Sequence, residues 1–188
     1  MERVSGLVAR ALRRGQTVEI DGLGTFEPGP GGQPLFTPQA AAQVFVAYVA
    51  EDFALARRVC QALKEGGCSP WLDKEKLLPG QNWPRAIERA IEISDAFVAC
   101  FSTRSVAKRG PFQGELRYAF DCARRRPLSD SPEDSFIIPV RLERCKIPRR
   151  ISEEVQYVDL FPDWERGMRK LLRAVNRTAR KRPVAGLA

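Results

Sequence analysis

Between residues 44 and 175, short apolar runs alternate with amphipathic segments, and this alternation limits the possible folds more than any other feature. The runs are VFVAYV (44–49), AFVACF (96–101) and FIIPVRL (136–142), with a less apolar one, CSPWLD (68–73), after the first. Each has the length of one strand, and strands that are apolar on both sides are typical of a parallel sheet covered on both faces. Apolar residues at helical spacing predict helices over 53–65, 84–93 and 164–180, and another around KRGPFQGELRYAF (108–120). We therefore predict an α/β fold with helices on both faces of a parallel sheet.

Sheets of this kind place their ligands at the carboxyl ends of the strands. In this chain those ends are residues 48–52, 73–80, 102–105 and 141–145. Side chains that serve chemistry or binding are expected in these four segments.

Residues 1–40 follow a different pattern. Apolar residues at helical spacing predict a helix over 3–14, and QTVEIDGLGTFEP (16–28) then alternates apolar and polar residues as paired strands do. GPGGQP (29–34) predicts a turn, LFTP (35–38) a return strand, and TPQAAAQ (37–43) a linker. We expect a small N-terminal segment over 1–40, a main domain over 44–178 and a basic tail over 179–188.

The chain contains no histidine, which excludes Ser-His-Asp and Cys-His catalysis and disfavours a zinc site. Chemistry here must use carboxylates, hydroxyls, thiols, Lys, Arg or backbone groups. The five cysteines form no CxxC pair and lie mostly in apolar runs, as reduced cytoplasmic thiols do. No apolar run approaches the ~20 residues that span a bilayer, and arginines interrupt the N-terminal apolar stretch. We expect a cytoplasmic protein without a membrane span.

The net charge of +8 is concentrated at the C-terminal end, where residues 164–188 hold eight basic residues and one acidic residue. One interpretation is a final amphipathic helix whose basic face is solvated. The other is a contact with nucleic acid or an anionic lipid surface.

Four segments of 44–175 resemble, in order, motifs of the TIR (Toll/interleukin-1 receptor) domain. VFVAYVAED resembles the first strand and loop, F-I-S-Y-S-x-x-D, and WLDKEKLLPGQNW resembles the second strand with its D-x-x-x-L-x-P-G loop. ISDAFVACFSTRSV resembles the strand with an S-D start and an S-x-x-S exit, and FQGELRYAF resembles the helix of the catalytic glutamate. The resemblance implies a flavodoxin-like fold and, as in many bacterial, plant and animal members, cleavage of NAD⁺ at its nicotinamide–ribose bond. The dinucleotide fingerprint G-x-G-x-x-G is absent, so NAD⁺ is expected as a substrate and no cofactor is expected.

By this resemblance Glu115 is the catalytic carboxylate. Its helical neighbours three and four positions away, Pro111, Phe112, Tyr118 and Ala119, include no cation. The nicotinamide ring of NAD⁺ is a pyridinium cation, and it becomes neutral when its bond to ribose breaks. No general acid is therefore needed to protonate the leaving group. The ribose becomes oxocarbenium-like, and a nearby carboxylate stabilises that charge or hydrogen-bonds the ribose hydroxyls. The alternative is an ordinary glutamate near a helix start, where the helix dipole favours it.

The resemblance also assigns a substrate-binding set and an assembly loop. The substrate-binding candidates are Tyr48, Val49, Ala50, Glu75, Ser102 and Phe112. The assembly-loop candidates are Leu77, Leu78, Pro79 and Gly80, because active members form homo-oligomers in which this loop completes a neighbour's site. For Glu75 the alternative is a solvated loop charge. Ser102 and Ser105 are candidates for hydrogen bonds to phosphate or ribose, and for Ser105 the alternative is a loop cap.

Three positions depart from the family pattern: Ala47 replaces a serine, Val49 a serine or arginine, and Pro111 an aromatic one turn before the glutamate. These departures keep a second hypothesis open, a non-catalytic adaptor that acts through TIR–TIR contacts. A third hypothesis comes from residues 1–40, which resemble the front half of the HU/IHF family of DNA-bending proteins through Gly15, the strand residues 18–26, and Phe36 with Pro38. The basic arm of that family is replaced by GPGGQP and the segment is neutral, so we interpret it as a folding or self-association element. Nucleic acid remains a weaker alternative partner.

Overall fold

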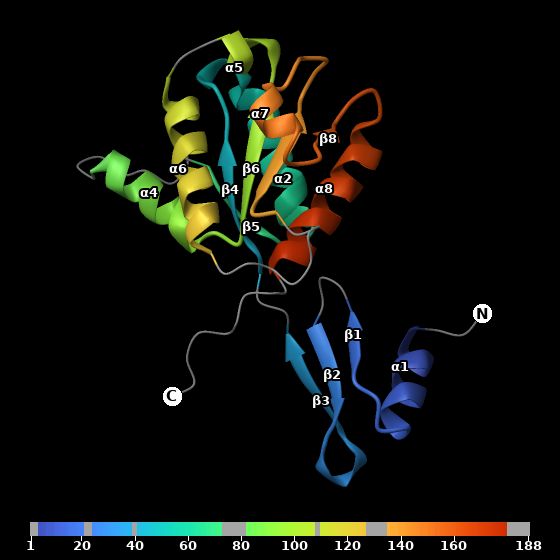
Figure 1. Cartoon of the computed structure of the whole chain (residues 1–188). Helices are drawn as coiled ribbons and strands as arrows, with labels where there is room; N and C mark the ends of the chain where they lie inside the picture. Colours follow the sequence, from blue (N-terminus) through green and yellow to red (C-terminus); the bar gives the residue numbers. More distant parts are fainter. Residues whose placement is uncertain are drawn as a thin grey trace. The chain divides into compact units, whose positions relative to one another are not determined.

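The computed structural model describes residues 4–20, 24–38, 41–72, 82–107, 110–126 and 135–179. The chain divides into two compact units, residues 1–41 and residues 42–188, which are described separately (Figure 1). The boundary between these units lies in the segment TPQAAAQ (37–43).

The N-terminal unit consists of one helix and a small antiparallel sheet. Helix α1 (Val4–Arg13) is followed by β1 (Val18–Ile20), β2 (Gly24–Pro28), a 3₁₀ turn η1 (Pro30–Gly32) and β3 (Pro34–Pro38). The strands pair in the order β1-β2-β3. The helix and strands lie where the apolar periodicity predicted them. Gly31 and Gly32 adopt φ of 74° and 80°, a left-handed conformation that favours glycine and explains the GPGG turn between β2 and β3.

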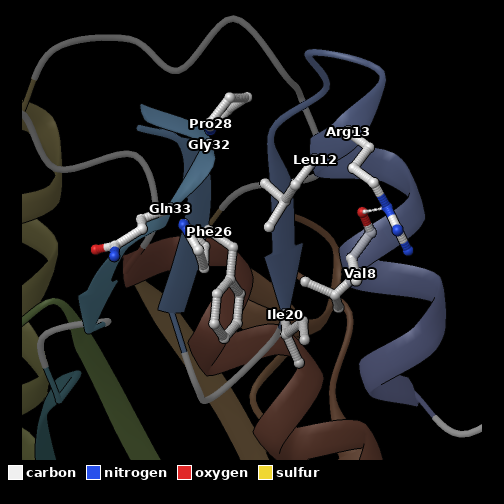
Figure 2. A pocket seen from close by; sticks show the side chains of 10 residues that line it. Val8, Leu12, Arg13, Ile20, Phe26, Pro28, Gly32 and Gln33 are labelled. Carbon is white, nitrogen blue, oxygen red and sulfur yellow. Dashed lines mark hydrogen bonds between the residues drawn. The ribbon is translucent and has the colours of Figure 1, made fainter. Parts of the chain in front are cut away.

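The sheet of this unit is apolar on one side, since Val18, Phe26 and Phe36 are cross-strand partners. A cavity of about 870 Å³ lies between that sheet and α1 (Figure 2). Its lining is almost entirely apolar and contains no carboxylate: Val8, Ala9, Leu12, Arg13, Ile20, Phe26, Pro28, Gly32, Gln33 and Pro34. A polar, anionic dinucleotide finds few partners in such a cavity, and none of the predicted site residues lies in this unit.

The second unit holds a five-stranded sheet in the order β5-β4-β6-β7-β8, with every pair parallel. The strands are β4 (Gln43–Ala47), β5 (Ser69–Trp71), β6 (Ala96–Phe101), β7 (Ile137–Arg141) and β8 (Val158–Asp159). The predicted parallel sheet is confirmed. Strand β8 was not predicted, because two residues carry no periodic signal.

Helices cover both faces of this sheet (Figure 1). Helices α2 (Phe53–Glu65) and α8 (Trp164–Ala179) pack on one face, and α4 (Trp83–Ile93), α6 (Pro111–Arg125) and α7 (Arg149–Ser152) pack on the other. A short helix, α5 (Thr103–Ala107), follows β6, and a 3₁₀ turn, η2 (Ala50–Asp52), follows β4. Successive strand residues enter opposite layers of core, as Phe45 and Val46 do. This two-sided burial explains the uninterrupted apolar runs.

All five cysteines are buried, and none of them forms a disulfide. Burial raises the pKa of the Cys68 thiol to about 11, and burial also raises the pKa of Cys100. Among the described residues, no helix has the length and apolar composition needed to cross a membrane. In the same part of the chain, no group of three or more Cys, Asp or Glu side chains is arranged to hold a metal ion.

Candidate active site

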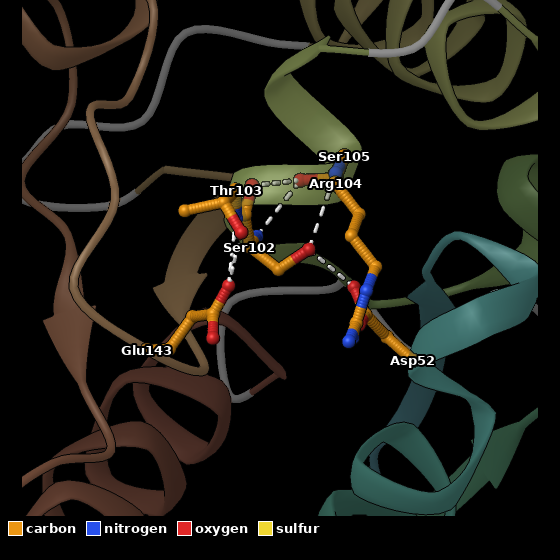
Figure 3. A network of polar contacts seen from close by, with 6 residues as sticks. All are labelled: Asp52, Ser102, Thr103, Arg104, Ser105 and Glu143. Carbon is orange, nitrogen blue, oxygen red and sulfur yellow. Dashed lines mark hydrogen bonds and ion pairs between the residues drawn. The ribbon is translucent and has the colours of Figure 1, made fainter.

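The carboxyl ends of β4, β6 and β7 meet at one edge of the sheet, and polar side chains from all three connect there (Figure 3). Asp52 follows β4, the segment from Ser102 to Ser105 follows β6, and Glu143 follows β7. Three of the four strand-end segments expected from the sequence are therefore brought together. The fourth, residues 73–80, lies outside the described residues.

Asp52 is the centre of this network, although it is only 2% exposed. Ser102 Oγ donates a hydrogen bond to Asp52 Oδ2 at 2.5 Å, and Arg104 Nη1 forms an ion pair with Asp52 Oδ1 at 3.0 Å. The side chain of Arg104 remains 57% exposed, so the buried carboxylate anchors a guanidinium at the surface of the strand-end edge. A buried carboxylate needs such partners, because leaving its oxygens unbonded is costly.

Ser102 and Ser105 form a reciprocal cap at the start of α5. Ser105 N donates to Ser102 Oγ at 3.1 Å, and Ser102 N donates to Ser105 Oγ at 2.8 Å. This is a capping box with serine in place of the usual Glu or Gln. Ser102 is 1% exposed, and its hydroxyl bonds protein groups on both sides. The capping interpretation of the S-x-x-S motif is confirmed, and contact of Ser102 with substrate stays a prediction.

A second contact joins β6 to β7. Thr103 Oγ1 and Thr103 N donate to Glu143 Oε1 at 2.6 and 2.9 Å. The bond from the Thr103 hydroxyl, followed by the bond from its amide, lowers the pKa of Glu143. The carboxylate therefore stays ionised and holds the two loops together.

Helix α6 begins at this same edge and carries Glu115. The ring of Phe112 packs edge-to-face on Phe101, the last residue of β6, with centroids 5.4 Å apart. Gln113 Nε2 donates to Ser105 O at 3.2 Å, which ties the first turn of α6 to α5. At its other end, α6 is anchored by Arg126 Nη2, which donates to Ser94 O at 2.6 Å before β6 begins. Glu115 thus lies near the end of α6 that starts at the strand-end edge.

The direction of Glu115 around α6 follows from helix geometry. Residues three and seven positions further, Tyr118 and Cys122, share its side of the helix. Tyr118 Oη donates to Glu92 Oε1 of α4 at 2.6 Å, so this side of α6 faces α4. Glu115 is partly buried, between the buried Phe112 and Leu116 on one side and Tyr118 on the other. The other predicted carboxylate and the assembly residues precede α4 in the sequence, and all of them lie outside the described residues: Glu75, Leu77, Leu78, Pro79 and Gly80.

The remaining substrate-binding candidates differ in accessibility. Tyr48 and Val49 are buried at the end of β4, and Ala50 is exposed in η2. Phe112, in the first turn of α6, is buried against the sheet. The roles of these residues toward a substrate stay predictions.

Asp52 is the residue that the sequence argument missed as a site element. The signal was present, because Asp52 occupies the final D of the quoted F-I-S-Y-S-x-x-D motif. Its importance depends on burial and on a serine fifty positions away, and neither can be inferred from local sequence.

A parallel sheet covered on both faces, with polar loops and a helix-borne glutamate at its carboxyl edge, defines a doubly wound α/β domain. Residues 44–172 match the family model of the TIR domain, and the chain belongs to that family. A TIR domain of the Toll-related receptor TRR-2 from Hydra magnipapillata is similar at 20% identity and TM-score 0.58, over 72% of this chain and 98% of that one. A TIR-STING receptor from C. gigas, solved in complex with 2′,3′-cGAMP, is similar at 19% identity and TM-score 0.59, over 74% of this chain and 41% of that one. A comparison with curated protein sequences gives no match.

The two structural likenesses concern the fold alone. The family match begins after the N-terminal unit, and the resemblance of residues 1–40 to the HU/IHF family stays a prediction.

Proposed function

We propose that this TIR protein is an NAD⁺ glycohydrolase in which Glu115 stabilises the ribose cation as nicotinamide leaves. The observation that carries the proposal is the placement of Glu115. Glu115 is partly buried and lies near the N-terminal end of α6. At that end Phe112 packs on Phe101, the last residue of β6. Ligands of such sheets bind at this edge.

The chemistry requires little beyond this carboxylate. The C–N bond between ribose C1′ and nicotinamide breaks, the bonding pair goes to the pyridine nitrogen, and nicotinamide leaves without a proton. The cationic ribose is then attacked by water, which releases a proton to solvent and gives ADP-ribose, or by a ring nitrogen of adenine to give a cyclic product. A fixed negative charge is most effective where positive charge develops and bulk water is partly excluded. Phe112 and Leu116 supply the apolar surroundings on the inner side of Glu115.

The edge network has a supporting role in this proposal. Asp52, Ser102 and Ser105 fix the loop after β6, and Gln113 transmits that position to α6. Tyr48, Val49 and Ala50 provide backbone at the end of β4, and Glu75 contributes from the loop before α4. Residues 77–80 pack against a second copy in a homo-oligomer, so activity rises when the protein self-assembles, as in bacterial defence or signalling.

The test is a chromatographic time course of NAD⁺ with concentrated protein, with and without a crowding agent. Wild type is expected to release nicotinamide, and Glu115→Gln, which keeps the shape and removes the charge, is expected to lower the rate by about 10²–10³-fold. The matched control is Glu165→Gln, which removes an exposed glutamate from the first turn of α8, on the other face of the sheet. Its rate should equal that of wild type.

Two outcomes contradict the proposal. If assembled wild type releases no nicotinamide, the adaptor hypothesis replaces the enzyme hypothesis. If Glu115→Gln and Glu165→Gln lose the same activity, the charge of Glu115 has no special role.

A further inference from the structure

The outer face of α8 carries four exposed cations, Arg166, Arg169, Lys170 and Arg173, which we call the basic stripe. Their spacing of three, one and three residues places them within about 100° of one another around the helix, and 1.5 Å of rise per residue gives a row about 10 Å long. Arg177 continues the same row one turn later. The helix therefore displays an ordered line of positive charge.

The opposite side of α8 is fully used by the core. Met168, Leu171 and Val175 are buried against the sheet, at the rotation about 180° from the centre of the basic stripe. The fold therefore explains only the apolar side of α8. It sets no requirement for the line of cations on the outer side.

The basic stripe is not neutralised by the protein around it. Within the described ranges, none of its four side chains has a hydrogen bond or an ion pair, and residues 166–188 contain no acidic residue at all. Some surface arginines elsewhere do pair with carboxylates: Arg124 pairs with Asp121, and Arg149 pairs with Glu153. A surface without a binding role usually intersperses both signs.

A neighbouring helix extends the positive surface. Arg58 of α2 stacks over the ring of Trp164 at 4.0 Å, at the start of α8. The nearest acidic residue in α8 is Glu165, in the first turn. It lies beside the row of cations and does not interrupt it.

We propose that the basic stripe binds the phosphate backbone of duplex nucleic acid without sequence preference. This inference goes beyond the proposed NAD⁺ cleavage and does not depend on it. A membrane surface is the less suitable partner, because a membrane-bound helix inserts its apolar side and that side of α8 lies in the core. A single strand is less suitable as well, since no aromatic side chain lies among the four cations to stack on bases.

The affinity of such a contact depends on salt in a calculable way. Neutralising about four phosphates of a duplex gives a slope of about −4 in log K against log salt concentration. Affinity should then fall about 100-fold between about 50 and 200 mM salt. Each cation removed should reduce the slope by about 1.

The experiment is fluorescence anisotropy of the full chain with a short labelled DNA duplex of mixed sequence, over a salt series. The test variant replaces the four residues of the basic stripe with glutamine. The matched control removes the same number of exposed cations from the opposite face: Arg85, Arg89, Arg117 and Arg124, each to glutamine. A third variant, Arg166→Lys/Arg169→Lys/Arg173→Lys, retains charge while changing side-chain shape.

The stripe variant is expected to lose about 100-fold in affinity at low salt and about 4 in slope, while the control and lysine variants remain close to wild type. Circular dichroism confirms that each variant is folded, which is expected because all substituted side chains are exposed. Equal losses in the stripe and control variants would show that net charge alone binds DNA and would overturn the proposal. So would binding to vesicles of phosphatidylcholine with phosphatidylserine in the absence of duplex binding, or a single strand bound more tightly than the duplex.

Discussion

Replacing Ser102 with alanine tests whether the strand-end network is held by the buried Asp52 carboxylate. The change removes the donor to Asp52 Oδ2 and the acceptor of the Ser105 amide. Loss of a helix cap costs about 1 kcal/mol, and a buried carboxylate oxygen left without its donor adds about 1–3 kcal/mol. We expect Ser102→Ala to lower the free energy of unfolding by about 2–4 kcal/mol.

Thr103→Ala is the neighbouring control. It removes a hydroxyl that bonds the exposed Glu143 carboxylate, which water can solvate instead. The expected cost is about 0.5 kcal/mol. Ser102→Ala and Thr103→Ala therefore differ mainly in the burial of the carboxylate that loses its hydrogen-bond donor, which is buried in Asp52 and exposed in Glu143.

Urea denaturation followed by tryptophan fluorescence measures this difference. The three tryptophans, Trp71, Trp83 and Trp164, all lie in the second unit, so the signal reports on the TIR domain and not on the N-terminal unit. With a slope of about 2 kcal/mol/M, the urea midpoint of Ser102→Ala should fall by about 1–2 M and that of Thr103→Ala by about 0.3 M.

A double-mutant cycle identifies the partner. Asp52→Asn and Ser102→Ala should be coupled by about 1 kcal/mol or more, because the residues share a buried hydrogen bond. Equal midpoints for Ser102→Ala and Thr103→Ala, or additive effects in the cycle, would refute the argument that Asp52 depends on Ser102.

Two further predictions concern other parts of the TIR unit. Gly167→Ala in α8 should destabilise the protein by about 1–3 kcal/mol in the same urea assay, because the new Cβ would meet backbone, including Leu160 Cα at 2.9 Å. Gly114→Ala in α6 has nothing within 4 Å of its Cβ and should instead stabilise by about 0.5–1 kcal/mol, and a loss in both variants would contradict the steric reason. The hydrogen bond to Glu92 raises the pKa of Tyr118 to about 12. Because this pKa is higher than in the unfolded chain, the stability that Tyr118 contributes is complete below about pH 10 and is lost as the pH rises toward 12. A tyrosinate absorbance titration should show one group fewer near pH 12 in Tyr118→Phe, whereas identical curves in that range would exclude the effect.

The parallel sheet could be predicted from the sequence because burial on both faces leaves a local signal. Every residue from Ala96 to Phe101 is apolar, and each side of that strand meets a different layer of core. Strand β8 left no such signal. It is a strand because its backbone pairs with β7, where Asp159 also forms an ion pair with Arg141, a residue eighteen positions earlier in the chain.

The candidate site was predictable only in part, for the same reason. The S-x-x-S spacing of Ser102 and Ser105 is local, so a capping role could be anticipated and was found. Asp52 looks like any acidic loop residue until the fold buries it against Ser102. The assignment of Glu115 came from a family resemblance, because helical periodicity places its side chain on the helix but does not specify the groups that face it from α4.

The two proposals place their residues in opposite layers of the TIR unit, so each serves as the control for the other. Glu115 belongs to α6, which packs on the face formed with α4 and α7, and the basic stripe belongs to α8, which packs with α2 on the other face. The side chains of the stripe point away from the core, so their neutralisation leaves the packing of Met168 and Leu171 intact. Removing the stripe should therefore lower duplex affinity by about 100-fold at low salt and leave NAD⁺ cleavage at the wild-type rate. Glu115→Gln should do the reverse, and a variant that loses both activities would show that the two faces are coupled through the sheet or through assembly on the duplex.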